Sequence, residues 1–222
     1  MIDIRAAAPV RASLPFGFAA FTAIVLALAA IPAHAQIWNE TGDAGDLVGT
    51  AQLTAGPGAL TQIKGNLASA TDVDVYCVQL IATPPVFSAI VGLNCAVIQG
   101  PNVWLFDAAG NGIASNTTCS GGSKQIVAPA TPLPVGNYYV AVSYFDYDPQ
   151  SSLGAIWNPG PPFWRTPDGP GAGGTLTGWA GTPNVQPLNP YQVFLNPGFA
   201  YCDQVTPTQH RTWGSLKIHY ER

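Results

Sequence analysis

The chain has 222 residues and a formal net charge of −4 at pH 7, and only 9% of its residues are charged. Nucleic-acid binding requires clustered Lys and Arg, and the eight cations here are scattered, which argues against that class of partner. The chain also contains 24 glycines and 21 prolines. Few charges with many turn-forming residues are typical of an all-β domain with long loops.

The first 35 residues have the pattern of a secretory signal peptide. Arg5 and Arg11 form a basic start, residues 16–31 are apolar, and residues 33–35 (Ala-His-Ala) match a small-x-small cleavage site. The apolar run is short for a membrane span, and an uncleaved anchor is the alternative. We predict cleavage before Gln36 and export to the periplasm, the cell surface or the medium. No second apolar segment follows, so we expect no integral membrane domain after cleavage.

Alternating apolar and polar residues between Gly, Asp and Asn turns predict half-buried β-strands after the signal peptide. An N-terminal strap at 36–58 should precede strands at 61–67, 73–81, 86–93, 103–107, 113–115, 138–144 and 191–196. Tyr76, Val78 and Leu80 are expected on one face of their strand. The pattern predicts one β-sandwich over 36–204. For the tail at 205–222 an added strand is favoured over an attachment tag.

Four segments carry a family resemblance: GDAGDL at 42–47, DVDVY at 72–76, LFDAAGNGI at 105–113 and NYYVAVS at 137–143. The residues of these segments and their order resemble those of the bacterial pre-peptidase C-terminal (PPC) domain, which is appended to secreted proteins. The resemblance extends over about residues 38–201. It implies a β-sandwich of jelly-roll type and an exported, non-catalytic module.

Some relatives of the PPC family bind calcium through the N-terminal strap, so the resemblance makes Asp43 and Asp46 the candidate calcium ligands. Calcium takes about six to eight oxygen ligands, largely from Asp side chains and turn carbonyls. Ordinary turn and capping roles are the favoured interpretation for both residues. Asp72 and Asp74, at the start of a predicted strand, are assigned structural roles. Ca²⁺ is the one cofactor that the sequence suggests.

The cysteines are Cys77, Cys95, Cys119 and Cys202. An even number in an exported chain predicts two disulfides, for which three connectivities exist. Cys95 and Cys119 flank the hairpin predicted at 103–115 and should meet at its open end. This placement favours Cys95–Cys119 together with Cys77–Cys202. Four free thiols are the alternative, and zinc is disfavoured because no Cys-x-x-Cys spacing occurs.

The stretch from Asp146 to Pro190 is rich in glycine, proline and aromatic residues. Its composition predicts no regular secondary structure over most of its length, and loops this long usually serve a function. Trp157 and Trp164 are the candidate ligand-binding surface, exposed on extended, unpaired chain, whereas Trp179 is expected to be packed. The favoured interpretation is instead that these aromatic rings cover an open end of the sandwich and complete its core.

Catalytic patterns are weak in this sequence. No Gly-x-Ser-x-Gly motif occurs and the histidines after residue 36 lie in the tail, which disfavours a Ser-His-Asp triad. The number of Asp residues would allow a carboxylate pair for glycoside hydrolysis, but most of them lie in turn-like segments. We predict a non-enzymatic binding or adhesion module for a protein or polysaccharide surface. The alternatives are a structural envelope or matrix component without a specific ligand, and a secreted hydrolase with an unrecognised site.

Overall fold

A computed structural model describes residues 36–81, 88–92, 101–117, 123–127, 133–160, 164–183, 190–195 and 198–202. The predicted signal peptide, the tail at 205–222, and Cys95 and Cys119 with their predicted bridge lie outside these residues. The described part contains fifteen strands and one short 3-10 helix, and no α-helix. None of its helices is long and apolar enough to cross a membrane.

The elements follow one another along the chain in an order that matches most of the predicted strands within a few residues. They are β1 (Gln36–Asn39), η2 (Val48–Thr50), β2 (Gln52–Leu53), β3 (Leu60–Gly65), β4 (Val73–Leu80), β5 (Ser88–Gly92), β6 (Asn102–Asp107), β7 (Gly112–Asn116), β8 (Ser123–Val127), β9 (Gly136–Ser143), β10 (Tyr147–Ser151), β11 (Gly154–Ala155), β12 (Trp164–Arg165), β13 (Gly178–Gly181), β14 (Tyr191–Leu195) and β15 (Phe199–Tyr201).

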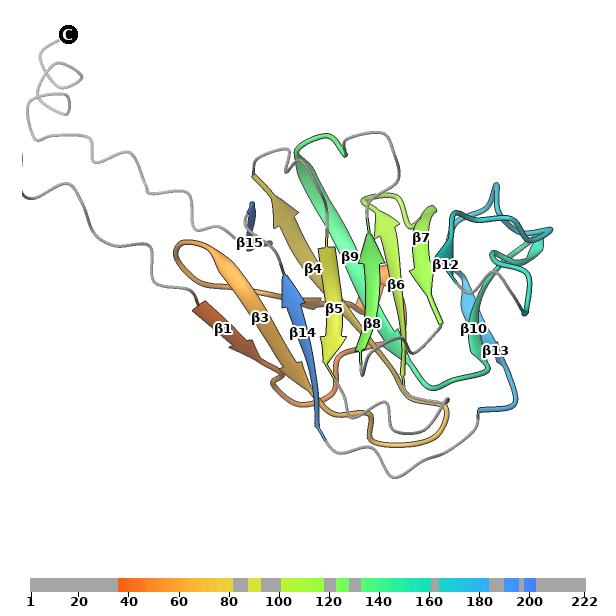
Figure 1. Cartoon of the computed structure of the whole chain (residues 1–222), viewed down its shortest axis with the longest axis horizontal. Coiled ribbons are helices and arrows are strands. Elements are labelled where there is room, and N and C mark those ends of the chain that lie inside the picture. The colour runs from red at the N-terminus through yellow and green to blue at the C-terminus, as the bar shows by residue number, and fades with distance from the viewer. Residues whose placement is uncertain are drawn as a thin grey trace, which may run out of the picture. The chain divides into compact units, whose positions relative to one another are not determined.

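Two sheets face each other across the main core (Figure 1). One has the strand order β1-β3-β14-β5-β8, and the other has the order β12-β7-β6-β9-β4-β15 with β2 beside β4. Both sheets contribute buried side chains to a single cluster, including Ile63 and Val193 from the first and Val78 and Val140 from the second. Burying one such side chain stabilises the fold by about 1.5–3 kcal/mol. The predicted all-β class is therefore confirmed, and the sheets pack as a sandwich.

The period-2 pattern assigns the faces of β4 as predicted. Tyr76, Val78 and Leu80 point into the main core. Val73 and Val75 point to the other side of the sheet and join a second buried cluster. Both faces of β4 are therefore covered, which explains why nearly every one of its side chains is buried.

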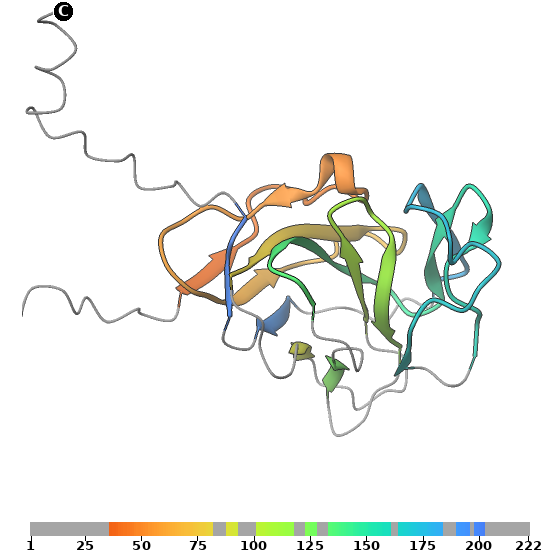
Figure 2. The ribbon, with the colours of Figure 1, turned by 90° about the horizontal axis from the view of Figure 1, so that it is seen from above.

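The second cluster lies on the outer face of the β4-containing sheet. The strap covers part of it through Leu47, Val48 and Ala51, and the long loop covers the rest through Ile156, Trp157, Leu176 and Trp179. Figure 2 shows η2 and β2 of the strap, in orange, on the side of β4 and β9 opposite to β5 and β8. The molecule therefore has a covering layer over its sandwich, built from the two segments that looked least regular in the sequence.

The long loop corrects one prediction, because it contains strands of its own. Strands β11, β10 and β13 form a small antiparallel sheet, and β12 pairs with β7, placing Trp164 opposite Asn116. Backbone hydrogen bonds from Gly169 to Ile156 (3.0 Å) and from Gly171 to Ala155 (2.8 Å) fix its turns. A Cβ at either glycine would collide with the backbone of residues 154–156. The glycines thus permit the close chain approach that satisfies these backbone groups.

The predicted Cys77–Cys202 disulfide is confirmed, with a Cα–Cα distance of 5.4 Å. It joins β4 to the residue after β15, where Tyr201 already pairs with Val78. The buried Thr54 hydroxyl donates to the Cys77 carbonyl (2.7 Å) and accepts from the Cys202 backbone N–H (3.0 Å). The end of the sandwich is therefore tied to a central strand by a covalent bond and a shared polar bridge.

Candidate functional site: an acidic cluster beneath the strap

Three carboxylates converge where the strap meets the sandwich. Glu40 follows β1, Asp43 lies in the next turn, and Asp74 lies on β4. One oxygen from each lies within 4.8 Å of the others. Asp74 has no exposed surface, Glu40 is half-buried and Asp43 is exposed. The cluster therefore runs from the core out to solvent.

Backbone contacts place Glu40 in this cluster. Strand β1 runs parallel to β3, and the Glu40 N–H continues that pairing by donating to the Lys64 carbonyl at 2.8 Å. The Glu40 carboxylate then accepts from the backbone N–H of Ala44 at 3.1 Å and of Asn66 at 2.8 Å. Gly42 turns the chain between Glu40 and Ala44 with a φ of 75°, in the left-handed region that favours glycine. One side chain thus connects the strap to the end of β3.

Asp74 reaches the same point from the interior. It lies two residues before Tyr76 and so shares the core-facing side of β4. Its Oδ2 accepts from the Tyr191 hydroxyl at 2.5 Å, and that hydroxyl lies 2.7 Å from the Tyr76 hydroxyl. Gly65 leaves room for both rings, because a Cβ there would collide with both hydroxyl groups. The other oxygen of Asp74, Oδ1, is buried and accepts no hydrogen bond within the described part of the chain.

Burial raises the pKa of Asp74 to about 9. The hydrogen bond from Tyr191 opposes this rise, and the negative charges of Glu40 and Asp72 add to it. Burial also raises the pKa of Asp72 and of Asp46, and Asp43 reinforces both shifts. Within the described residues, no Lys or Arg forms an ion pair with these carboxylates. The ion pair found there joins Arg165 to Asp168. The site therefore holds excess negative potential that a cation would relieve.

The geometry and chemistry of the three carboxylates fit calcium. Calcium–oxygen bonds are about 2.3–2.6 Å long, so two ligands of one ion are separated by at most about 5 Å. The 4.8 Å limit on the three oxygens meets that condition. The oxygen donor set suits a hard cation, and exposed Asp43 leaves room for water to complete the coordination. The buried Oδ1 of Asp74 would gain in a bound cation the partner that the protein does not supply.

The sequence named one member of this cluster and missed two. Asp43 lies in it, whereas Asp46 lies outside the trio, and the Asp46 carbonyl accepts from the Trp179 indole at 2.7 Å. Glu40 and Asp74 were not named as ligands. The signal for Asp74 is its position, because a carboxylate stands on the face of β4 that is otherwise apolar. Glu40 gives a weaker signal as an acid three residues before Asp43.

The predicted aromatic surface is corrected at Trp157. Its side chain is only 3% exposed, and its ring packs on Trp104 (5.2 Å between centroids) and Phe106 (5.8 Å). The loop folds back and inserts this ring into the second cluster, because the outer face of the sheet needs apolar cover. The backbone of Trp164 is paired in β12 rather than unpaired, and its side chain lies outside the described residues.

The prediction that Trp179 is packed is confirmed. Its ring is half-buried and lies against Trp104 (6.1 Å), Phe106 (6.4 Å) and Tyr147 (6.5 Å).

No protein-family model matches the sequence, and no curated protein matches it.

Proposed function

We propose that this chain is an exported, non-catalytic PPC-like module that binds a protein or polysaccharide surface, and that calcium holds its strap against the sandwich. The observation that carries the proposal is the group of three carboxylates without a paired cation in the described residues, one of them fully buried. Two of its members belong to the strap segment and the third to a central strand. A bound ion would join them.

The position of the cluster supports a structural role for the ion in binding. The strap covers part of the second buried cluster through Leu47, Val48 and Ala51. Fixing the strap at Glu40 and Asp43 therefore favours the covered state of that face. Ligands that bind only the folded state stabilise it by mass action. In an exported module, calcium at millimolar concentration would keep the covering layer in place.

A hydrolytic role is disfavoured at this cluster. Glu40 and Asp74 resemble an acid–base pair, since burial and neighbouring charges raise the pKa of Asp74. A catalytic carboxyl must reach its substrate. Asp74 has no exposed surface, so we assign the pair to ion binding.

Calorimetric titration of the chelated mature protein with Ca²⁺ tests the proposal. We expect one site with a Kd of about 0.1–1 mM, the range of many extracellular calcium modules. Asp43→Asn removes a ligand and should abolish the heat signal. Asp46→Asn is the matched control, because it removes the same charge nearby from outside the trio, and it should weaken binding only modestly.

A second measurement tests the binding role itself. The protein is pelleted with insoluble polysaccharides and applied to immobilised surface proteins, with calcium and with chelator. Binding that chelator weakens would support the full proposal. Absence of a calcium signal, or equal loss in Asp43→Asn and Asp46→Asn, would remove the calcium part, whereas failure to bind any surface would remove the adhesion part.

A further inference from the structure

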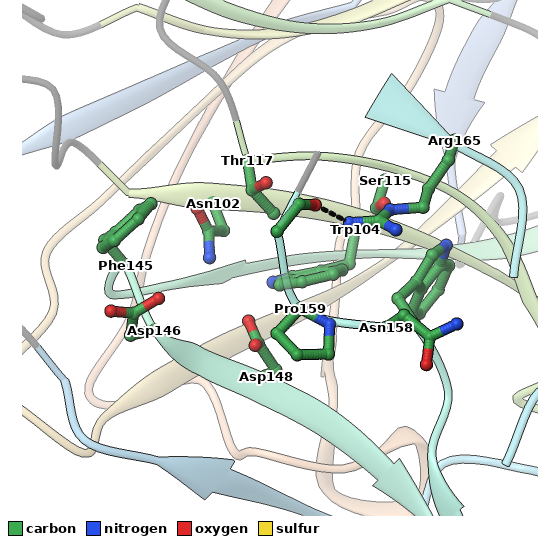
Figure 3. A pocket seen from close by; sticks show the side chains of 12 residues that line it. Asn102, Trp104, Ser115, Thr117, Phe145, Asp146, Asp148, Asn158, Pro159 and Arg165 are labelled. Atoms are coloured by element: carbon green, nitrogen blue, oxygen red, sulfur yellow. Dashed lines mark hydrogen bonds between the residues drawn. The ribbon is translucent and has the colours of Figure 1, made fainter. Parts of the chain in front are cut away.

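A second site lies at the opposite edge of the β4-containing sheet, where β6 and β7 meet the β9–β10 turn. The cavity there has a volume of about 30 Å³. Its walls come from β6, β7, the β9–β10 turn, β10, residues 157–160 and β12 (Figure 3). The residues that matter below are Asn158, Ser115, Asp146, Asp148, Trp157 and Arg165.

Two buried polar groups in this wall have no protein partner within the described residues: the Ser115 hydroxyl and the Trp157 indole N–H. Their residues are 1% and 3% exposed. Leaving such a group unpaired costs about 1–3 kcal/mol, so native structures seldom retain one without a reason.

The other indoles with described hydrogen bonds make the contrast clear. The N–H of Trp38 donates to Gln52, that of Trp104 to Ser143, and that of Trp179 to the Asp46 carbonyl, at 2.7–2.9 Å. The fold therefore pairs its indoles elsewhere. The N–H of Trp157 is the exception, and it stands in the wall of a cavity.

Charges of both signs surround these two groups. Asp146 and Asp148 line the cavity together with Arg165, and Figure 3 shows the two aspartates across Trp104 from the arginine. The guanidinium is held in place by Asp168 at 2.9 Å and by the Gly160 carbonyl. Asp146 has a φ of 60°. Such strained backbone is retained where the surrounding structure fixes it, often at binding sites.

The mixture of groups selects the chemistry of the ligand. An anion would be repelled by the two carboxylates, and a cation could not pair with the Trp157 N–H, which only donates. A neutral hydroxyl satisfies both kinds of partner, since it can accept from the Trp157 N–H and donate to a carboxylate. The small volume admits one or two such groups rather than a whole ring. Exposed Asn158 and Pro159 at the rim leave a surface for the remainder of the ligand.

We propose that this cavity is a carbohydrate subsite, in which hydroxyl groups of a sugar residue bind between Trp157, Ser115 and the charged groups of the β9–β10 turn, β10 and β12. The inference rests on the proposed binding function and names a polysaccharide as its ligand class. It involves none of the residues of the acidic cluster, so the two sites can be tested separately.

The test is a binding screen of the mature protein with D-glucose, D-galactose, N-acetyl-D-glucosamine and their β-1,4-linked oligomers, followed by calorimetry on any that bind. Trp157→Phe keeps a smaller aromatic ring and deletes the donor, and Ser115→Ala deletes the hydroxyl. Each should weaken sugar binding about 3- to 10-fold, the effect of losing one hydrogen bond. Trp179→Phe is the control. It deletes a paired indole N–H from the same aromatic group outside the cavity, and it should leave affinity unchanged.

Melting temperatures separate loss of the site from loss of the fold. Ser115→Ala should melt no lower than the wild type, because it removes a buried group that lacks a protein partner. Trp157→Phe also leaves a space where the larger buried ring packed, so it should melt lower. If Trp157→Phe fails to fold, Ser115→Ala decides. Sugar binding that both variants retain at full strength would overturn the cavity assignment while leaving the binding module intact. No binding of any probe sugar would overturn the inference, and the calcium titration would still judge the acidic cluster independently.

Discussion

The buried carboxyl of Asp74 makes the stability of the metal-free protein depend on pH in a defined direction. Its pKa is raised to about 9 in the folded state, against about 3.9 in an unfolded chain. Below pH 4 both states carry the proton and the group adds no pH dependence. Between pH 4 and 9 only the unfolded state releases it, so stability is lost as the pH rises towards 9. Asp74→Asn removes this group and should remove its share of the slope.

The magnitude follows from one proton. A difference of one bound proton changes the free energy of unfolding by about 1.4 kcal/mol per pH unit. From pH 5 to pH 8, the stability of Asp74→Asn relative to the wild type should therefore rise by about 4 kcal/mol. All other titrating groups are shared by the two proteins, and they largely cancel in that difference.

Urea unfolding at pH 5, 6, 7 and 8 in the presence of chelator measures this difference. Calcium at saturating concentration should reduce the wild-type slope, because metal ligands bind in their deprotonated form. The variant should show little calcium response. A stability difference between the two proteins that stays constant from pH 5 to pH 8 would mean that Asp74 titrates alike in both states, and the reasoning about its burial would be wrong.

Three further outcomes follow from other parts of the chain. Replacing Cys77 and Cys202 together with Ala opens a loop with a sequence separation of 125 and should cost about 4–5 kcal/mol in the chain-entropy model; a urea midpoint equal to the wild type would contradict this. Gly65→Ala should destabilise the fold by about 1–3 kcal/mol, because the added Cβ overpacks against two tyrosine hydroxyls. The melting temperature should fall accordingly, and an unchanged melting curve would refute the contact. The intact mass of the exported protein should match a chain that begins at Gln36, and a mass that includes residues 16–31 would exclude cleavage there.

The two proposed sites depend on the covering layer in different ways. The acidic cluster ties the strap to β4 through Glu40, Asp43 and Asp74, whereas the cavity is enclosed by the long loop at 157–160. Both segments pack on the second buried cluster. Calcium removal should therefore loosen the strap directly and the loop only through the shared cluster, so chelator should weaken sugar binding without abolishing it.

The sequence by itself determined the strands and their inner faces. Alternation along 73–81 and 138–144 placed Tyr76, Val78 and Val140 in one core, because side chains of a strand alternate between its two faces. The Cys77–Cys202 bridge was also predicted from sequence, as the pair left once Cys95 and Cys119 were matched across their hairpin. These features depend on local periodicity and on simple connectivity, which a single chain displays directly.

Only the tertiary structure decided where the two sites lie. Glu40 and Asp74 meet because β1 pairs with β3 in one sheet while β4 belongs to the other, and no local pattern specifies which strands become neighbours. Trp157 is buried because Trp104 and Phe106 leave an apolar outer face that some segment must cover. The near-continuous apolar run of β6 is consistent with cover on both faces. That pattern does not identify the covering segment as the long glycine- and proline-rich loop, because the choice of segment depends on the close backbone approach at Gly169 and Gly171.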